Sequence, residues 1–501
     1  MLTGTNLEFY PYSGAMPNTS VPNCAISSSG IAFMAVSKGV RTPNKFSCES
    51  YFAALPPPGK DFSPPFHLKA TGCVGLAGSP VFSRDGKSLA FLREKSDREL
   101  LVSTSMFIIR DISRSLDTEA IPLVDRAGKA SSLYPDSVQF STDRSALLFS
   151  ASHLGRQKIF RVAITDTVFA PEQIAPSPQE RGSIMDYHVV ENTAGKEVCF
   201  LTRSTFVTPN WFSMLDLKTG ATTDLPGLGP TRLGLSHRQI SEIWYDSGDR
   251  QIHAFVLRPS TFDKTKSYPV AMLIHGGPIS AWLDCFHPRW APAVFAEQGY
   301  VVVMPNFTGS TGYSQQFRAD IWGDPGGQAY RDIAAGLEYV AKALPYADTD
   351  RAVCLGGSFG GQMVLWIAGQ PLAKRFQCLV AHAPFVFGST SIYSSDVSDW
   401  YQNLFVGVDE DVDQRDLNGW VDRWDPSRRA ERWSTPLLLT HGGLDSRCPV
   451  SSSIAAFTYS QKKGVDSRLL VFPDESHFIL KPENWYHWFA EILAWIDKYT
   501  E

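Results

Sequence analysis

The stretch AVCLGGSFGG (352–361) decides the fold of the C-terminal half of the chain. It begins with apolar and small residues typical of a buried strand, and the apolar run GQMVLWIAG that follows has helical spacing. Ser358 stands between them in a G-x-S-x-G motif with Gly356 and Gly360. A serine in such a tight turn adopts a strained backbone, and flanking glycines avoid the clash of neighbouring Cβ atoms. The stretch therefore predicts a nucleophile elbow, with an exposed hydroxyl at the carboxyl end of a sheet.

The sequence around this motif alternates short apolar strands with longer runs that have helical spacing. The expected strands are YPVAMLIHGG, YVVVMPN, AVCLGG, CLVAHAPF, PLLLTHGG and RLLVFPD. Continuous apolar strands separated by helices indicate a mostly parallel sheet with helices on both faces. We therefore predict an α/β-hydrolase fold for residues 241–501.

Two further residues have the chain order and position of triad partners for Ser358. Asp445 directly follows the strand PLLLTHGG, and His477 follows RLLVFPD. The order Ser, acid, His is that of α/β-hydrolases, and all three residues come at strand carboxyl ends. Asp474 and Glu475 are rival acids, but they are only two or three residues from His477 and poorly placed to reach its far nitrogen. His477 as a surface histidine and Asp445 as a turn former are the alternatives, and the combined pattern favours a Ser-His-Asp triad.

An oxyanion hole requires two backbone N–H donors beside the serine. One donor is expected from Phe359, the residue after the nucleophile. The other is expected from the loop HGGP (275–278), whose glycines let the backbone approach a substrate closely. A plain tight turn is the alternative for this loop.

The first 225 residues have a different pattern, of short strands and frequent turns. Four similar strand–turn–strand stretches place aromatics at equivalent positions, 58, 58 and 51 residues apart: Phe33, Phe91, Phe149 and Phe200. Such an interval predicts a β-propeller of about four blades over residues 1–225, with a β-sandwich as the alternative. The Gly- and Pro-rich residues that follow predict a linker over 226–240.

Residues 241–499 resemble the catalytic domain of the prolyl oligopeptidase family of serine peptidases, above all its acylaminoacyl-peptidase and dipeptidyl-peptidase V branches. The motifs that carry the resemblance are HGGP (275–278), NFTGSTGY (306–313), GGSFGG (356–361), HGGLDSRCP (441–449) and FPDESHF (472–478). The resemblance implies an active site between a propeller and the hydrolase domain, with the triad Ser358, Asp445 and His477. It also implies Gly277 as the second oxyanion donor. Thr308 and Ser314 depart from the family pattern, in a loop outside the triad.

The propeller is the larger departure, because the family has seven or eight blades. No pair of glutamates can be assigned to gripping a free amino terminus. A small ring leaves little axial channel, so we expect substrate to reach Ser358 from the side, through the gap between the domains. If the blades do not close, a second subunit is expected to cover their edges. The aromatic-rich segment 386–434 is expected either to line the substrate pocket or to pack a helical cap.

Composition and charge restrict the remaining classes of function. The net charge of −5 gives no reason to expect a nucleic-acid partner, and no apolar run is long enough to span a membrane. The eight cysteines are scattered without zinc spacing, and the N-terminus lacks the pattern of a secretory signal, so a reducing, cytoplasmic location is expected. No metal or organic cofactor is expected, and a homo-oligomer is left open.

We therefore predict a serine hydrolase that acts through an acyl-enzyme. The resemblance favours a peptidase that cleaves short peptides by removing aminoacyl or dipeptidyl units. An esterase, thioesterase or lactonase acting on a small metabolite is the alternative, because one triad serves all of these substrates. A non-catalytic binding protein built on the propeller is the second alternative.

Overall fold

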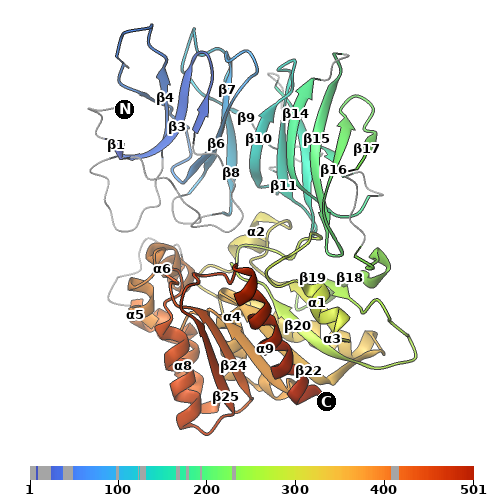
Figure 1. Ribbon diagram of the computed structural model, residues 1–501. Helices are drawn as coiled ribbons and strands as arrows, with labels where there is room; N and C mark the ends of the chain where they lie inside the picture. The colour runs from blue at the N-terminus through green and yellow to red at the C-terminus, as the bar shows by residue number, and fades with distance from the viewer. Residues whose placement is uncertain are drawn as a thin grey trace.

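The protein divides into β-sheets at the N-terminal end and an α/β layer at the C-terminal end (Figure 1). The computed structural model describes residues 7–8, 24–37, 49–61, 63–96, 101–121, 123, 131–164, 170–176, 180–191, 195–227, 233–386, 388–407 and 417–501. Within these ranges, no helix combines the length and the apolar character needed to cross a membrane.

The N-terminal part consists of four antiparallel sheets that follow one another along the chain. The first contains β1 (Leu7–Glu8), β2 (Cys24–Ile26), β3 (Gly30–Ser37), β4 (Glu49–Ala54) and β5 (Phe66–His67). The second contains β6 (Ala77–Phe82), β7 (Leu89–Glu94), β8 (Thr104–Ile109) and β9 (Glu119–Ile121). The third contains β10 (Pro135–Phe140), β11 (Ala146–Ser152), β12 (Gln157–Ala163) and β13 (Glu172–Ala175). The fourth contains β14 (Ser183–Glu191), β15 (Glu197–Thr205), β16 (Thr208–Asp216) and β17 (Thr222–Asp224).

Each sheet repeats the same aromatic contact, as the sequence repeat predicts. Phe33, Phe91, Phe149 and Phe200 lie on β3, β7, β11 and β15. Each ring stacks on an aromatic ring of the next strand, with centroids 5.4 to 5.7 Å apart and interplanar angles of 18 to 23°. Neighbouring sheets pack on one another along the chain: β2 contacts β6, β6 contacts β10, and β10 and β12 contact β14. The predicted propeller-like domain of about four blades is confirmed, and the β-sandwich alternative is not needed.

The C-terminal part is built on one eight-stranded sheet in the order β18-β19-β21-β20-β22-β23-β24-β25. Its strands are β18 (Ile240–Ser247), β19 (Arg250–Leu257), β20 (Tyr268–Ile274), β21 (Val301–Asn306), β22 (Ala347–Gly357), β23 (Cys378–His382), β24 (Leu437–Gly442) and β25 (Ser467–Phe472). Strand β19 pairs antiparallel with both of its neighbours, β18 and β21, whereas β20 to β25 run parallel to one another. The carboxyl ends of β22, β24 and β25 therefore meet at one edge of the sheet, as predicted for an α/β-hydrolase.

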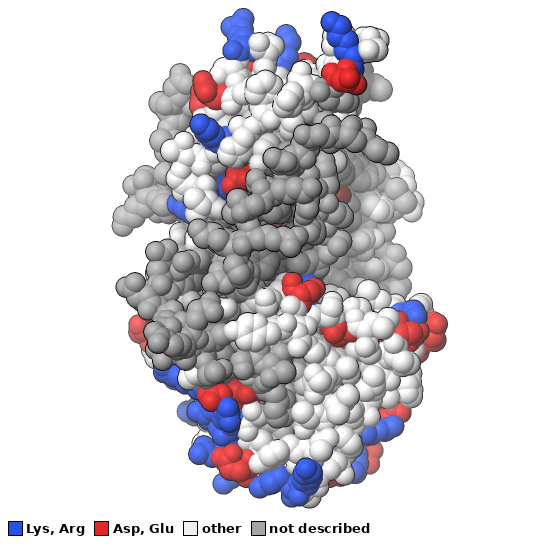
Figure 2. Space-filling view, turned by 90° about the vertical axis from the view of Figure 1, so that its left-hand side faces the viewer, with Lys and Arg blue, Asp and Glu red and all other residues white. Residues whose placement is uncertain are grey.

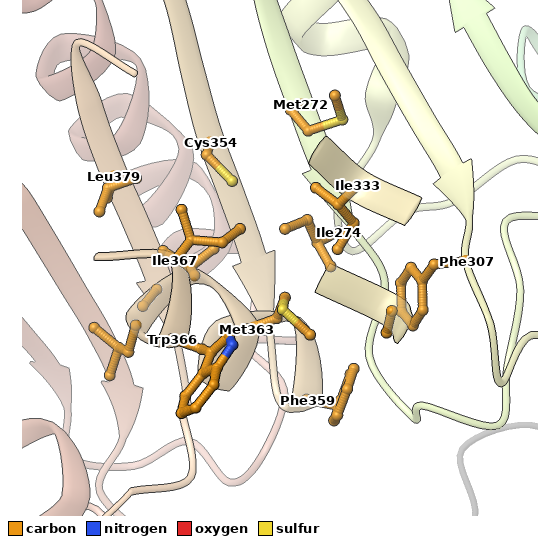
Figure 3. Close-up of a cluster of buried hydrophobic side chains, with 14 of the residues drawn as sticks. Met272, Ile274, Phe307, Ile333, Cys354, Phe359, Met363, Trp366, Ile367 and Leu379 are labelled. Atoms are coloured by element: carbon orange, nitrogen blue, oxygen red, sulfur yellow. The ribbon is translucent and has the colours of Figure 1, made fainter. Parts of the chain in front are cut away.

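Helices cover both faces of this sheet. One face packs on α3 (Gln328–Ala343), α4 (Phe359–Ala368) and α8 (Ser451–Lys462), and the other on α1 (Pro292–Glu297) and α9 (Pro482–Thr500). The pleat sorts successive side chains between the faces. Met272 and Ile274 pack on the face covered by α3 and α4 (Figure 3), whereas Leu273 packs on the face covered by α1 and α9. Each strand is buried on both sides, which explains the continuous apolar runs in the sequence.

Charges of both signs are interspersed on the described surface of the hydrolase part in the view of Figure 2. The last blade strand, β17, ends at Asp224, and β18 begins at Ile240. Residues 228–232 of the predicted linker lie outside the described residues. The domain limits 1–225, 226–240 and 241–501 stay predictions.

Candidate active site

Ser358 occupies the turn between β22 and α4 in a strained conformation, with φ 59° and ψ −122°. A non-glycine residue at positive φ costs free energy and persists only where its surroundings enforce it. Here the glycines permit the close approach: a Cβ on Gly360 would lie 2.2 Å from the carbonyl oxygen of Ile274, and one on Gly356 only 2.5 Å from Gly360. The turn therefore has the geometry that the G-x-S-x-G motif predicts.

The structure brings Asp445 and His477 together from the ends of neighbouring strands. His477 Nδ1 donates to Asp445 Oδ2 at 2.7 Å. Asp445 Oδ1 accepts two further hydrogen bonds at 2.9 Å, from the backbone N–H groups of Arg447 and Cys448. Burial alone would raise the pKa of Asp445, but the hydrogen bonds from His441 and His477 hold it well below its usual value. The carboxylate is thus ionised and oriented toward the imidazole.

The two rival acids have other partners in the structure. Asp474 is exposed and pairs with Lys481 and Asn484. Glu475 is buried and accepts from the backbone N–H groups of Leu480 and Lys481, at the start of α9. Its carboxylate therefore caps the beginning of the helix and does not face His477.

The hydroxyl of Ser358 lies beside a thiol that the sequence argument missed. Cys448 is fully buried, lies within hydrogen-bonding reach of Ser358, and contacts the Tyr401 hydroxyl at 3.0 Å. Burial raises the pKa of this thiol, so it is neutral. Within the described residues, no hydrogen bond joins Ser358 to His477, although both line the same cavity. Catalytic hydrogen bonds are often long in the absence of substrate and shorten when it binds.

The expected oxyanion donors lie on either side of Ser358. Phe359 is the first residue of α4, and the first N–H groups of a helix have no acceptor within it. Gly277 lines the cavity with φ +115°, and a Cβ on its neighbour Gly276 would lie 3.2 Å from Ser358 Cβ. His275 holds this loop, since its two ring nitrogens lie 2.7 Å from the Gly276 oxygen and 2.8 Å from Ser310 Oγ.

A second histidine fixes the acid of the expected triad. His441 Nε2 lies 2.7 Å from the backbone oxygen of Cys448 and 3.3 Å from Asp445 Oδ2. Both partners are acceptors, so Nε2 carries the proton and donates to them. Ser453 Oγ contacts the other ring nitrogen at 2.7 Å. His441 lies near the end of β24, and its place in the sequence HGG, just before Asp445, is the signal that could have identified this contact.

A third histidine, His382 at the end of β23, joins the nucleophile to the base. Its backbone oxygen accepts from Ser358 N at 2.9 Å, and its Nε2 lies 3.2 Å from the backbone oxygen of His477. Trp488 Nε1 donates to Thr440 Oγ1, which contacts His382 Nδ1, both at 2.9 Å. Burial lowers the pKa of His382 to about 3, so the ring is neutral and donates through Nε2. His382 thus holds both the turn that carries Ser358 and the loop that carries His477.

Ser358 and His477 open into a cavity of about 1250 Å³ between the two domains. The propeller contributes residues of β6, β10 and β14, the first strands of three blades. The hydrolase part contributes the loop that ends at Trp290 and, from the aromatic segment, Trp400 and Tyr401. Other aromatics of that segment pack inward, such as Trp424 on Trp366 at 5.6 Å. Both expectations for segment 386–434 thus hold in part, while its residues 387 and 408–416 lie outside the described residues.

Arg318 on α2 (Gln315–Ala319) reaches from the hydrolase part into the propeller. Its guanidinium lies over the Tyr134 ring at 4.9 Å, near the buried carboxylates of Glu94 and Asp136. Burial raises the pKa of Glu94 to about 7 and that of Asp136 to about 6, despite the hydrogen bonds that they accept from Tyr134 and Gln157. Arg318, Tyr134 and Asp136 line the cavity, whereas Glu94 is outside its lining and accepts from the Tyr134 hydroxyl.

Comparison with known proteins identifies relatives over most of the chain. Residues 286–501 match the model of the prolyl oligopeptidase family. A probable dipeptidyl-peptidase 5 of Emericella nidulans is 35% identical over 93% of this chain and 63% of its own length. Dipeptidyl-peptidase 5 of Schizosaccharomyces pombe is 34% identical over 85% of this chain and 59% of its own. The chain thus spans less than two thirds of the curated relatives it matches.

Solved structures share the fold at lower identity. The acylaminoacyl peptidase of Pyrococcus horikoshii has a TM-score of 0.75 at 18% identity, over 95% of this chain and 70% of its own. A puromycin-hydrolyzing peptidase of Mycobacterium tuberculosis has a TM-score of 0.69 at 19% identity, over 97% of this chain and 70% of its own. The motifs, the family model over residues 286–501 and the curated relatives agree: the catalytic part of the chain, residues 286–501, matches the prolyl oligopeptidase family.

Proposed function

We propose that the protein is a serine peptidase that cleaves short peptides through an acyl-enzyme, with Ser358 as nucleophile, His477 as base and Asp445 as acid. The observation that carries the proposal is the 2.7 Å hydrogen bond from His477 Nδ1 to Asp445 Oδ2, in the cavity that holds Ser358. Because Nδ1 donates to the carboxylate, Nε2 is the nitrogen free to accept a proton.

The proposed reaction has two steps. Ser358 Oγ bonds to the carbonyl carbon while His477 Nε2 takes the hydroxyl proton, and the N–H groups of Gly277 and Phe359 donate to the carbonyl oxygen as it becomes negative. The C–N bond then breaks, and His477 gives the proton to the leaving amine. Water attacks the ester by the same route, which releases the acid and restores Ser358. Each oxyanion donor contributes about 3 kcal/mol to the transition state.

The proposed substrates are peptides from which an aminoacyl or dipeptidyl unit is removed. The support is the printed names of the relatives, dipeptidyl-peptidase 5 and acylaminoacyl peptidase. A cavity of about 1250 Å³ has room for a short peptide. We also propose that substrate enters through the gap between the domains and that the protein works in the cytoplasm. The seven described cysteines, all unpaired, support the reducing compartment.

Two measurements test this function. A fluorophosphonate probe should form an adduct on Ser358, and its absence would favour a non-catalytic protein. Rates on aminoacyl and dipeptidyl anilides should exceed those on matched simple esters and thioesters. If only esters or thioesters were hydrolysed, the enzyme would be a metabolite hydrolase and the peptidase proposal would be wrong.

A further inference from the structure

The loop from Asp284 to Trp290 connects the propeller to the elbow. Asp284 is buried and accepts from the backbone N–H groups of Gly182 and Phe206 in the fourth blade, at 3.0 and 3.1 Å. At the other end, Trp290 lies so close to the elbow that a Cβ on Gly357 would be 3.0 Å from its ring. Arg289, between them in the chain, lines the same cavity as Ser358 and His477.

Arg289 differs from the other arginines that line this cavity. Arg84 pairs with Glu191, Arg447 pairs with Asp396, and Arg318 lies near two buried carboxylates. Among the described residues, no carboxylate pairs with Arg289; its guanidinium carbon lies 3.9 Å from the centroid of the Phe478 ring. Burial lowers the pKa of Arg289, as expected for a cation without a nearby anion. A partly buried guanidinium of this kind is ready to receive an anion from a ligand.

The position of Arg289 indicates which part of the substrate supplies that anion. Phe478 follows His477 in the chain, and their ring centroids are 4.9 Å apart. His477, as the proposed base, gives its proton to the leaving amine, so the leaving group must lie on the His477 side of the scissile bond. His477, Phe478 and Arg289 therefore follow one another along the wall that the leaving group faces. A short leaving peptide has one group that is always anionic at neutral pH, its C-terminal carboxylate.

We propose that Arg289 binds the C-terminal carboxylate of the leaving group, so that the enzyme prefers peptides ending shortly after the scissile bond. This inference rests on the proposed peptidase function. The planar guanidinium donates two N–H groups to the carboxylate, and the Phe478 ring fixes its plane. Longer leaving peptides place the carboxylate beyond Arg289 and lose the contact, because each added residue extends the chain by about 3.5 Å.

The test compares kcat/KM for alanine peptides of two to five residues, each as the free acid and as the C-terminal amide. The wild-type enzyme should prefer the acid about tenfold or more at the shortest length it cleaves, as for a hydrogen bond to a charged group. The preference should decline with length. Arg289→Gln should reduce the acid-to-amide ratio to near one, and Arg289→Lys should restore part of it. Arg375→Gln is the matched control, since Arg375 lies on the surface and pairs with Glu338, and this variant should keep the wild-type ratio.

Several outcomes would overturn the inference. The first is equal kcat/KM on acid and amide in the wild type, and the second is an unchanged acid-to-amide ratio in Arg289→Gln. The third is an equal loss of kcat/KM on both substrates in Arg289→Gln, which would mean that Arg289 only supports Phe478. A peptide amide with Asp after the scissile bond tests the other carboxylate source; preference for it without preference for free acids would also contradict the proposal. Anilides, whose leaving group has no carboxylate, distinguish a failure of the Arg289 proposal from a failure of the proposed peptidase function. Cleavage of anilides without acid preference refutes the Arg289 contact alone, whereas no cleavage of any peptide or anilide refutes the peptidase function and this inference with it.

Discussion

The two parts of the molecule are organised by opposite rules. In the propeller, structure repeats locally: Phe91 stacks on Phe107 and Phe149 on Phe160, each pair from adjacent strands of one sheet. In the hydrolase part nothing repeats, and Asp445 contacts His477 only because parallel strands end at one edge. The difference separates two tasks. The hydrolase part is expected to hold the chemistry, while the propeller provides walls for the cavity, so changes in the two parts should have different consequences.

The largest expected effect is on turnover, in the hydrolase part. Ser358→Ala or His477→Ala should lower kcat by up to about 10⁶, the loss measured for such residues in subtilisin. The melting temperature should stay close to wild type, because neither side chain belongs to a packed core. Steady-state kinetics on a cleavable anilide and thermal unfolding measure the two quantities. Residual activity above a few per cent in Ser358→Ala would contradict the assignment.

Replacement of the acid should come next. Asp445→Asn should reduce kcat by about 10⁴, because a neutral amide favours the wrong tautomer of His477. Asp474→Asn is the matched control: Asp474 is exposed on the same loop as His477 and contacts Lys481, so activity should hardly change. Glu475→Gln should lower kcat less than Asp445→Asn does, because it only weakens the hydrogen bonds at the start of α9. A ranking with Asp474 or Glu475 above Asp445 would assign the acid differently.

In the propeller the expected effect is on stability. Phe149 is fully buried and stacked on Phe160, so Phe149→Ala should reduce the free energy of unfolding by about 3–5 kcal/mol. Phe200→Ala is the matched control at the equivalent position, where the ring is only half-buried and the loss should be smaller. Denaturant unfolding measures both variants. Loss of turnover per folded molecule without loss of stability would mean that the blades take part in the chemistry.

A smaller effect on turnover is expected at His382, which joins the two loops of the expected site. His382→Ala removes the contact with the His477 backbone oxygen, and misplacement of this loop should lower kcat about tenfold to a hundredfold with little change in KM. Gln at this position can still donate to the carbonyl oxygen, so His382→Gln should recover part of the loss. If both variants had the same kcat, the hydrogen bond would not position His477.

The smallest effect is a change in the slope of stability with pH, from Glu94, a buried carboxylate of the propeller. The pKa of Glu94 is raised to about 7 in the fold, so between its unfolded value near 4.5 and pH 7 the folded state retains a proton that the unfolded state releases. Stability from this group is therefore complete below about pH 4.5 and falls as pH rises to 7, by at most about 1.4 kcal/mol per pH unit. Glu94→Gln should flatten this fall in unfolding curves recorded from pH 5 to 8. If the slope of stability with pH were unchanged in Glu94→Gln, Glu94 would not be the group that retains the proton.

Sequence and structure agree best where a residue's position follows from topology. Ser358, Asp445 and His477 each follow a strand, and parallel strands bring their ends together whatever the side chains in between. His382 and Cys448 were missed because their contacts depend on how side chains of distant elements pack around the elbow. The same holds for Arg289, which no motif identifies. The strands that form the propeller wall of the cavity could be predicted from the sequence. The residues of these strands that line the cavity could not, because the alternation of apolar and polar residues does not say which face of a blade meets the other domain.

The loop from Asp284 to Trp290 has a mechanical consequence. One end is anchored in the fourth blade through Asp284, and the other lies against the elbow through Trp290. A shift of that blade relative to the hydrolase part would therefore be transmitted through the loop to Arg289 and Trp290, beside Ser358. The proposed contact between Arg289 and the leaving group would thus depend on the placement of a domain that contains none of the three residues of the proposed triad.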